Sequence, residues 1–159
     1  MILRPNKIVK NIYEITPEML KEMGIHALLL DLDSTVMKSK TGEFTNETLE
    51  WFDKFKKDFY MAIVTNNHNQ EYIEKVCANA PCKVYWGANK PFSGTLKNIV
   101  KDLFMQPKQV VMVGDRPLTD ILSGKIAGTK TILVGSIDAN ENIIVRFARF
   151  VERLTICRF

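Results

Sequence analysis

The chain has 159 residues, 46% of them hydrophobic and 25% charged, which is the composition of one soluble globular domain. Its net charge of +4 is too small to indicate a nucleic-acid partner but suits an anionic substrate or surface. The sequence contains no secretory signal, no apolar run near the roughly 20 residues of a membrane span, and no C-x-x-C pair among its three cysteines, so we expect a cytoplasmic protein with reduced thiols.

Helices and strands are predicted to alternate along the chain. Residues 1–24 form an extension in which Thr16 and Pro17 begin a helix that ends near Gly24. Short apolar runs predict strands at 27–32, 60–64, 83–86, 109–113 and 131–134. Helical spacing predicts helices at 46–57, 69–78, 93–104, 118–127 and 141–154. Residues 36–44 are expected to form a small flap or hairpin.

This alternation predicts a three-layer α/β fold over residues 1–159, with a parallel sheet of about five strands. Each of the first four strands ends in polar residues, and the carboxyl ends of parallel strands share one edge of the sheet. Alternate residues of a strand point to the same side, so Asp31 and Asp33 can converge there. The other polar residues expected at this edge are Thr65, Asn66, Lys90, Asp115 and Asp120.

The acidic side chains of this edge need positive partners. Two carboxylates about 4 Å apart repel by about 4 kcal/mol at an effective dielectric constant of about 20. A bound Mg²⁺ together with Lys90 would neutralise Asp31, Asp33 and Asp115, and Mg²⁺ is usually held by a few carboxylates, water and phosphate oxygens. The pattern therefore predicts a Mg²⁺ cofactor and a phosphorylated substrate.

These residues resemble the four motifs of the haloacid dehalogenase superfamily. The matching stretches are Asp31-Leu-Asp33-Ser-Thr35, Thr65, Lys90 and Gly114-Asp115-Arg-Pro-Leu-Thr-Asp120, in the order that the superfamily has. The resemblance implies a Rossmann-like domain and a phosphoaspartyl intermediate. The gaps between the motifs are too short for a cap domain, so a capless enzyme with an open site is expected. The whole chain is similar to one capless group, the YqeG-like phosphatases related to phosphatidylglycerophosphate phosphatase.

The resemblance also implies a role for each site residue. Asp31 would be the nucleophile and Asp33 the general acid and base, with Thr65 and Lys90 holding the phosphate. Mg²⁺ would bind Asp31, the backbone carbonyl of Asp33, and Asp115, while Asp120 would support either the metal or Lys90. The residues expected either to contact the substrate or to be structural are Asn66 and Arg116.

Three functions remain open from the sequence. The first is hydrolysis of phosphatidylglycerophosphate in phospholipid synthesis, the second is hydrolysis of a soluble sugar phosphate, nucleotide or phosphoprotein, and the third is a binding protein on the same fold. Residues 141–159 bear on this choice, because Phe147, Phe150 and Leu154 form an apolar stripe flanked by arginines. This amphipathic helix would pack on the sheet or contact the inner face of an anionic membrane.

Overall fold

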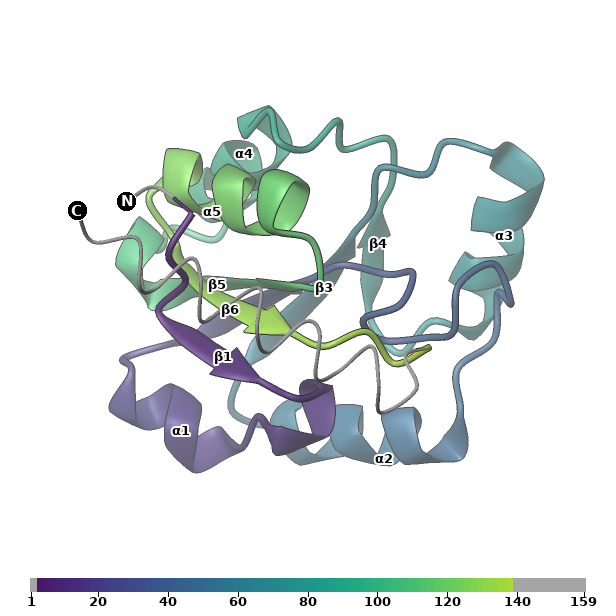
Figure 1. The fold of residues 1–159 in the computed structure, drawn as a ribbon, viewed down its shortest axis with the longest axis horizontal. Helices are drawn as coiled ribbons and strands as arrows, with labels where there is room; N and C mark the ends of the chain where they lie inside the picture. The colour runs from purple at the N-terminus through teal and green to yellow at the C-terminus, as the bar shows by residue number, and fades with distance from the viewer. Residues whose placement is uncertain (1–2, 139–159) are drawn as a thin grey trace.

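The computed structural model describes residues 3–138, which form a six-stranded parallel sheet with helices around it (Figure 1). The strand order is β1-β6-β5-β2-β3-β4. The strands are β1 (Lys7–Val9), β2 (Ala27–Leu30), β3 (Tyr60–Val64), β4 (Lys83–Tyr85), β5 (Val110–Gly114) and β6 (Lys130–Val134). The α-helices are α1 (Pro17–Glu22), α2 (Asn46–Phe55), α3 (Gln70–Asn79), α4 (Gly94–Asp102) and α5 (Leu122–Ala127).

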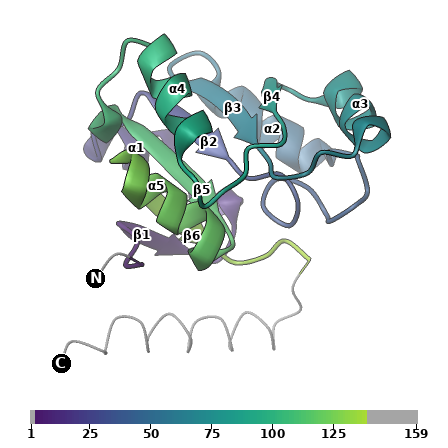
Figure 2. The same ribbon diagram turned by 90° about the horizontal axis from the view of Figure 1, so that it is seen from above.

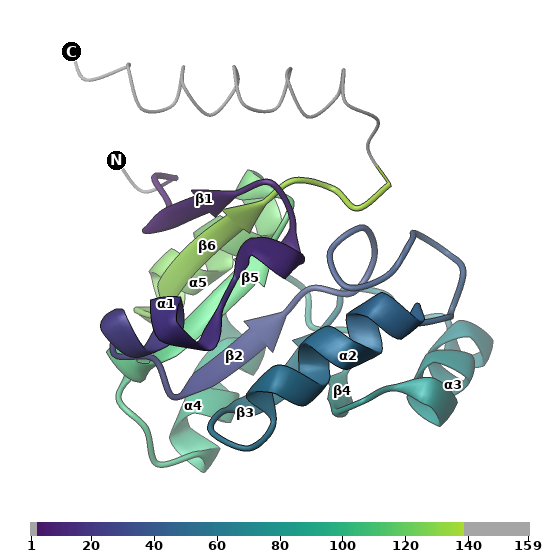
Figure 3. The ribbon, with the colours of Figure 1, turned by 90° about the horizontal axis from the view of Figure 1, so that it is seen from below.

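The sheet is the middle layer of three. Helices α4 and α5 cover one face (Figure 2), and α1 and α2 cover the other (Figure 3). Alternate residues of β2 enter the two cores: Leu28 and Leu30 pack with α1 and α2, whereas Ala27 and Leu29 pack with α4. Burial of all four residues of β2 explains why this strand reads as an uninterrupted apolar run. The predicted α/β fold with a parallel sheet is confirmed.

The predicted start of the first helix is also present. Thr16 is the N-cap of α1 and accepts a hydrogen bond from the backbone N–H of Met19 at 3.2 Å, with Pro17 in the first helical position. The chain then turns at Gly24, whose φ of 74° is a left-handed conformation that glycine adopts readily. This turn directs the chain into β2.

Three features differ from the predictions. The extension contains a sixth strand, β1, whose three residues pair with β6 at the edge of the sheet. The expected helix over 118–127 begins as a π-helix at Pro117–Ile121 and becomes α-helical only at Leu122. Residues 36–44 form an irregular loop with one bridge, between Asp33 and Met37, rather than a hairpin.

Two predictions concern the membrane. Within residues 3–138, the helices are all too short or too polar to cross a bilayer. The amphipathic helix expected at residues 141–154 lies outside the described part of the chain, so its contact with a membrane stays a prediction.

Candidate active site

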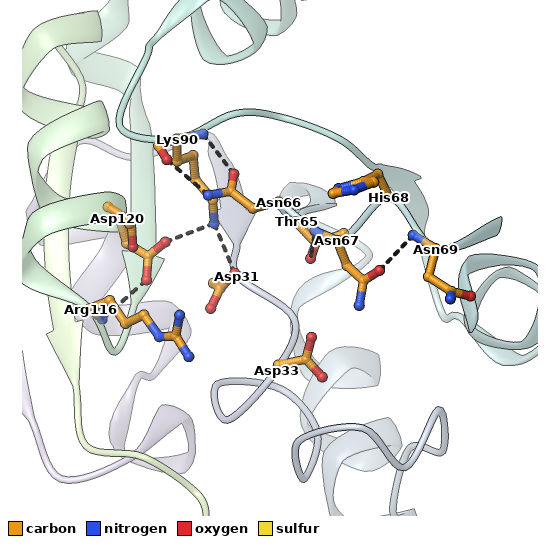
Figure 4. A pocket seen from close by; sticks show the side chains of 11 residues that line it. Asp31, Asp33, Thr65, Asn66, Asn67, His68, Asn69, Lys90, Arg116 and Asp120 are labelled. Carbon is orange, nitrogen blue, oxygen red and sulfur yellow. Dashed lines mark hydrogen bonds and ion pairs between the residues drawn. The ribbon is translucent and has the colours of Figure 1, made fainter. Parts of the chain in front are cut away.

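A cavity of about 490 Å³ lies at the carboxyl ends of β2 and β3, at the edge that the sequence indicated. Figure 4 shows the side chains that line it. Most of the predicted site residues are among them: Asp31, Asp33, Thr65, Asn66, Lys90, Arg116 and Asp120. The sheet topology therefore gathers residues that are up to 89 positions apart, counted from Asp31 to Asp120.

Lys90 is the centre of the site. Its ammonium group donates hydrogen bonds to Asp31 Oδ1 at 2.8 Å, Asp120 Oδ1 at 2.7 Å and the carbonyl of Val64 at 2.8 Å. Burial would lower the pKa of Lys90, but the charges of Asp120 and Asp31 outweigh burial and raise it. Lys90 is therefore a buried, fully charged group that holds one oxygen of Asp31. Within residues 3–138, Asp31 Oδ2 accepts no hydrogen bond.

The π-helix explains how Asp120 reaches Lys90. Its wider turn lets the backbone N–H groups of both Asp120 and Ile121 lie against the carbonyl of Arg116. The second carboxylate oxygen, Asp120 Oδ2, accepts the backbone N–H of Arg116 at 3.1 Å. Asp120 also occupies the space beside Gly114, where a Cβ atom would overlap its carboxylate. The glycine of the fourth motif thus makes room for the acid.

Asp31, Asp115 and Asp120 form a cluster in which one potential ligand atom from each lies within 4.8 Å of the others. Burial, followed by the charges of Asp31 and Asp120, raises the pKa of Asp115 to about 7. Burial also raises the pKa of Asp120, to about 6, against the opposing charge of Lys90. Lys90 bonds to Asp31 and Asp120, whereas the side-chain partner of Asp115 among the described residues is Thr35 Oγ1, at the long distance of 3.4 Å.

This cluster fits a hard divalent cation. It offers carboxylate oxygens, the ligands that Mg²⁺ prefers, and burial together with the charges of Asp31 and Asp120 raises the pKa of Asp115, so its ionised form would be stabilised by a cation. Asp33 is not part of the described three-residue cluster, and its side chain has other partners. Asp120 gives one oxygen to Lys90 and the other to Arg116, which favours a supporting role over direct ligation.

Asp33 is held by residues that the sequence did not indicate. The Tyr72 hydroxyl donates to Asp33 Oδ1 at 2.6 Å, and the backbone N–H of Lys40 donates to the same oxygen at 3.0 Å. Burial and the bond to Asp33 raise the pKa of Tyr72 above its ordinary value, so the phenol stays protonated and donating. Tyr72 lies in the first turn of α3.

The remaining predicted residues have distinct surroundings. Thr65 is buried, and its hydroxyl oxygen accepts the N–H of Asn67 at 3.2 Å, which leaves the hydroxyl proton to donate. The amide of Asn66 bonds to both backbone groups of Lys90, at 2.8 Å and 2.6 Å, so it positions the lysine. Arg116 is exposed and lines the cavity with its side chain. Asn66 thus positions Lys90 and also lines the cavity with Arg116, so contact of either residue with a substrate stays a prediction.

The loop that carries Asp33 is tied to the last described residues. The Asp138 carboxylate accepts a hydrogen bond from Ser34 Oγ at 2.6 Å and from the backbone N–H of Ser39 at 3.1 Å. The backbone N–H of Ile137 donates to the carbonyl of Ser34 at 2.8 Å. We call this set of contacts the Asp138 clasp. It holds both ends of the loop from Ser34 to Ser39, directly beside Asp33.

Comparison with known proteins shows where this site belongs. Residues 1–137 match the family described as mitochondrial PGP phosphatase. The chain belongs to this family. It is 32% identical over 149 residues to the probable phosphatase YqeG of Bacillus subtilis (strain 168), covering 94% of this chain and 87% of that one.

A second similar protein comes from a plant. The chain is 26% identical over 165 residues to phosphatidylglycerophosphate phosphatase 1, chloroplastic/mitochondrial, of Arabidopsis thaliana, covering 98% of this chain. The match spans 47% of the plant protein, about half of its length. The family and these relatives make the chain a phosphatase, as the sequence predicted.

Solved structures agree with this family in their fold. An uncharacterized protein from Listeria monocytogenes serotype 4b superposes with a TM-score of 0.60 at 18% identity, covering 82% of this chain and 97% of that one. A predicted HAD-like family hydrolase from Porphyromonas gingivalis gives 0.57 at 13% identity, with coverages of 79% and 98%. This chain thus shares the fold of the HAD-like hydrolase from Porphyromonas gingivalis. In residues 3–138, the first and second motifs are separated by a loop, α2 and β3, and the second and third by α3 and β4, so neither interval contains a cap domain.

Proposed function

We propose that this protein is a Mg²⁺-dependent phosphomonoester hydrolase that acts through a phosphoaspartate at Asp31. The observation that carries the proposal is the state of the Asp31 carboxylate. Lys90 fixes its Oδ1 at 2.8 Å, while Oδ2 accepts no hydrogen bond within residues 3–138 and borders the cavity. A nucleophile held by one oxygen with the other unencumbered is suited to attack on phosphorus.

Asp31 and Asp115 would hold the Mg²⁺, with the backbone carbonyl of Asp33 as a further ligand. When bound, the cation supplies positive charge that lets an anionic carboxylate approach an anionic phosphate. The chain adds positive charge of its own from Lys90, and Arg116 is placed to bind a phosphoryl oxygen. The Thr65 hydroxyl donates its proton to another phosphoryl oxygen.

In the first step, Asp31 Oδ2 forms a bond to phosphorus while the bond from phosphorus to the ester oxygen breaks. Protonated Asp33 gives its proton to the departing oxygen, so the alcohol leaves neutral. Tyr72 and Lys40 both bind Asp33 Oδ1, and Oδ2 accepts no hydrogen bond among the described residues, so Oδ2 is the oxygen that exchanges the proton.

In the second step, the Asp33 carboxylate takes a proton from a water molecule as that water attacks phosphorus. The bond between phosphorus and Asp31 breaks, which releases inorganic phosphate and restores the Asp31 carboxylate. Asp33 ends protonated and is ready for the next substrate. The same residue thus serves as acid and then as base, as the two halves of the reaction require.

The proposed substrate is phosphatidylglycerophosphate. Two observations support it: membership of the mitochondrial PGP phosphatase family, and a capless site that is open to a head group at a membrane surface. The weaker identity to the plant enzyme, 26%, supports the same substrate class. The protein would then work as a cytoplasmic or peripheral enzyme facing an anionic bilayer.

A substrate panel with matched variants tests the proposal. Wild-type protein should release phosphate from phosphatidylglycerophosphate faster than from sugar phosphates, nucleotides or phosphopeptides, and only with Mg²⁺ present. Asp31→Asn should abolish turnover, and Asp33→Asn should accumulate phosphorylated protein that acid quenching and mass spectrometry detect. Near-native activity of Asp31→Asn would exclude the nucleophile assignment. Preference for a soluble phosphate would favour the alternative substrate class.

A further inference from the structure

A second cavity, also of about 490 Å³, adjoins the active site. The two cavities share Asn67 and Asn69 in their linings. Figure 4 shows these two asparagines on the side of the active site away from Arg116 and Asp120. The other residues around the second cavity are Lys40, Glu71, Tyr72 and Lys75. Its size is within the usual range of small-molecule sites, and the mechanism above leaves it unused.

The second cavity begins at the partners of Asp33. Tyr72 lines it and donates its hydroxyl to Asp33 at 2.6 Å. Lys40 lines it too, and its backbone N–H donates to the same carboxylate. In the proposed reaction Asp33 protonates the departing oxygen, so the leaving group emerges at Asp33. The leaving group would then lie beside the second cavity, whose lining includes both partners of Asp33, Tyr72 and Lys40.

The charge of the second cavity is positive on balance, because two lysines and one glutamate line it. Lys75 is partly committed, since its ammonium donates to the carbonyl of Thr41 at 2.8 Å and lies 3.9 Å from Glu43. Lys40 has its backbone in the left-handed region, with φ of 62°, which glycine or asparagine adopts more easily. A lysine in such a position, on the loop that also holds Asp33, points to a use for its side chain.

We propose that the second cavity is a leaving-group subsite that binds a negatively charged phosphodiester, with Lys40 as its principal cation and Glu71 as a charge that limits affinity. The inference rests on the proposed function, because it places the alcohol of a phosphomonoester at Asp33. The subsite would make the enzyme prefer substrates with a second phosphate group near the scissile ester over simple phosphomonoesters.

Three soluble substrates distinguish the effect of the second phosphate group from the effect of the acyl chains. The first is glycerol phosphate, whose leaving group is neutral. The second is glycerol 1-phosphate esterified at its third carbon with methyl phosphate, which adds the phosphodiester alone. The third is dihexanoyl phosphatidylglycerophosphate, which adds short acyl chains as well. The measured quantity is the ratio of kcat/KM for each diester-bearing substrate to kcat/KM for glycerol phosphate. This ratio cancels any general effect of a variant on Asp33.

Two variants test the subsite, one that removes a positive charge and one that removes a negative charge. Lys40→Gln should lower the ratio about three- to fivefold, the effect of one partly exposed ion pair, and Glu71→Gln should raise it. Lys38→Gln, an exposed lysine two residues away that lines neither cavity, is the matched control and should leave the ratio unchanged. Circular dichroism and thermal melting check that each variant is folded.

The outcomes distinguish the subsite from the proposed function. A lower ratio for Lys40→Gln with the methyl diester supports a phosphodiester subsite, and a change seen only with the dihexanoyl substrate overturns it in favour of acyl-chain contact. Active enzyme whose ratios are the same in wild type and both variants overturns the subsite while the proposed function stands. Wild-type enzyme that hydrolyses none of these phosphomonoesters with Mg²⁺ overturns both.

Discussion

Gly114 is the residue whose small size matters most to the site. A Cβ atom at this position would overlap the Asp120 carboxylate, which in turn bonds to Lys90 at 2.7 Å. We predict that Gly114→Ala displaces Asp120 and, through Lys90, the nucleophile Asp31. A misplacement of about 1 Å lowers turnover by about a hundredfold in enzymes, so kcat should fall by about ten- to a hundredfold.

Gly94 provides the control for this substitution. It lies at the start of α4, and a Cβ atom there would meet no heavy atom within 4 Å. Gly94→Ala should keep wild-type kcat, as measured by phosphate release. Unchanged turnover in Gly114→Ala would show that Asp120 can move without consequence for Lys90.

Asp115 should make the metal-free protein less stable at alkaline pH. Its pKa is about 7 in the folded state against an ordinary value of 3.8, so the folded state prefers the protonated form. The stability from this preference is complete below the ordinary pKa and is lost as the pH rises through about 7. In EDTA at pH 8, Asp115→Asn should therefore melt above wild type, by about 2–4 °C for each kcal/mol relieved.

The pH dependence of this difference gives the check. Differential scanning fluorimetry in EDTA should show the two melting temperatures converging as the pH falls from 8 toward 4.5. Asp53→Asn, at an exposed carboxylate on α2, should show no such trend. A constant difference between Asp115→Asn and wild type across this range would rule out titration of Asp115 as its cause.

At the scale of elements, the Asp138 clasp joins the segment after β6 to the loop after β2. Removing the carboxylate in Asp138→Ala takes away the partners of Ser34 and Ser39, which leaves the loop beside Asp33 less well fixed. We predict that kcat falls about tenfold or more and that phosphorylated enzyme accumulates, because in the proposed mechanism Asp33 activates water in the second step. Asp138→Asn should retain part of the activity, since its carbonyl can still accept the N–H of Ser39.

Rapid-quench kinetics measure this accumulation directly. The surface variant Asp53→Ala, which removes an exposed ion pair with Lys56 on α2, is the control. If Asp138→Ala turns over at the wild-type rate, the loop keeps Asp33 in place without the clasp.

Helices and strands that leave a pattern in their own stretch of sequence could be predicted. Those that form through contacts with residues far away in the chain could not. The buried strand β2 is visible in the sequence as an apolar run, and the start of α1 is marked by the neighbouring residues Thr16 and Pro17. By contrast, β1 has three residues with little burial and is defined by its pairing with β6, more than 120 positions away. The π-helix at Pro117–Ile121 places Asp120 where Lys90, 30 residues earlier, donates to it, and no local sequence pattern indicates this contact.

The same distinction applies to the site as a whole. Parallel strands share one carboxyl edge, so residues after β2, β3, β4 and β5 were expected to meet, and the structure brings Lys90 within hydrogen-bond distance of Asp31 and Asp120. Tyr72 follows no strand directly, and its bond to Asp33 joins positions 39 residues apart through the packing of α3. The contacts of Asp138 likewise arise from tertiary structure, with a separation of 104 residues from Ser34.

Binding of Mg²⁺ should stabilise the whole molecule and reverse the order of the melting temperatures of wild type and Asp115→Asn. A cation at Asp31 and Asp115 binds the folded state and requires Asp115 to be ionised, so it should raise the melting temperature more at pH 8 than at pH 6. With Mg²⁺, wild type should melt above Asp115→Asn, the opposite of the order in EDTA. Scanning fluorimetry with and without Mg²⁺ measures this without reference to activity.

Calorimetry supplies an independent check. Below pH 7, Mg²⁺ should displace a proton from Asp115, so the apparent binding enthalpy should vary with the ionisation enthalpy of the buffer. Equal melting temperatures with and without Mg²⁺ for wild type at pH 8 would contradict a metal site at this cluster.

The position of β1 at the edge of the sheet has a consequence for protein synthesis. Among the described strands β1 pairs with β6 alone, so residues 7–9 have no place in the sheet until residues 130–134 have left the ribosome. Asp138 follows still later and completes the surroundings of Asp33. A nascent chain that already contains every motif from Asp31 to Asp120 would therefore be an unfinished enzyme, and its first hydrolysis would follow the emergence of its last strand.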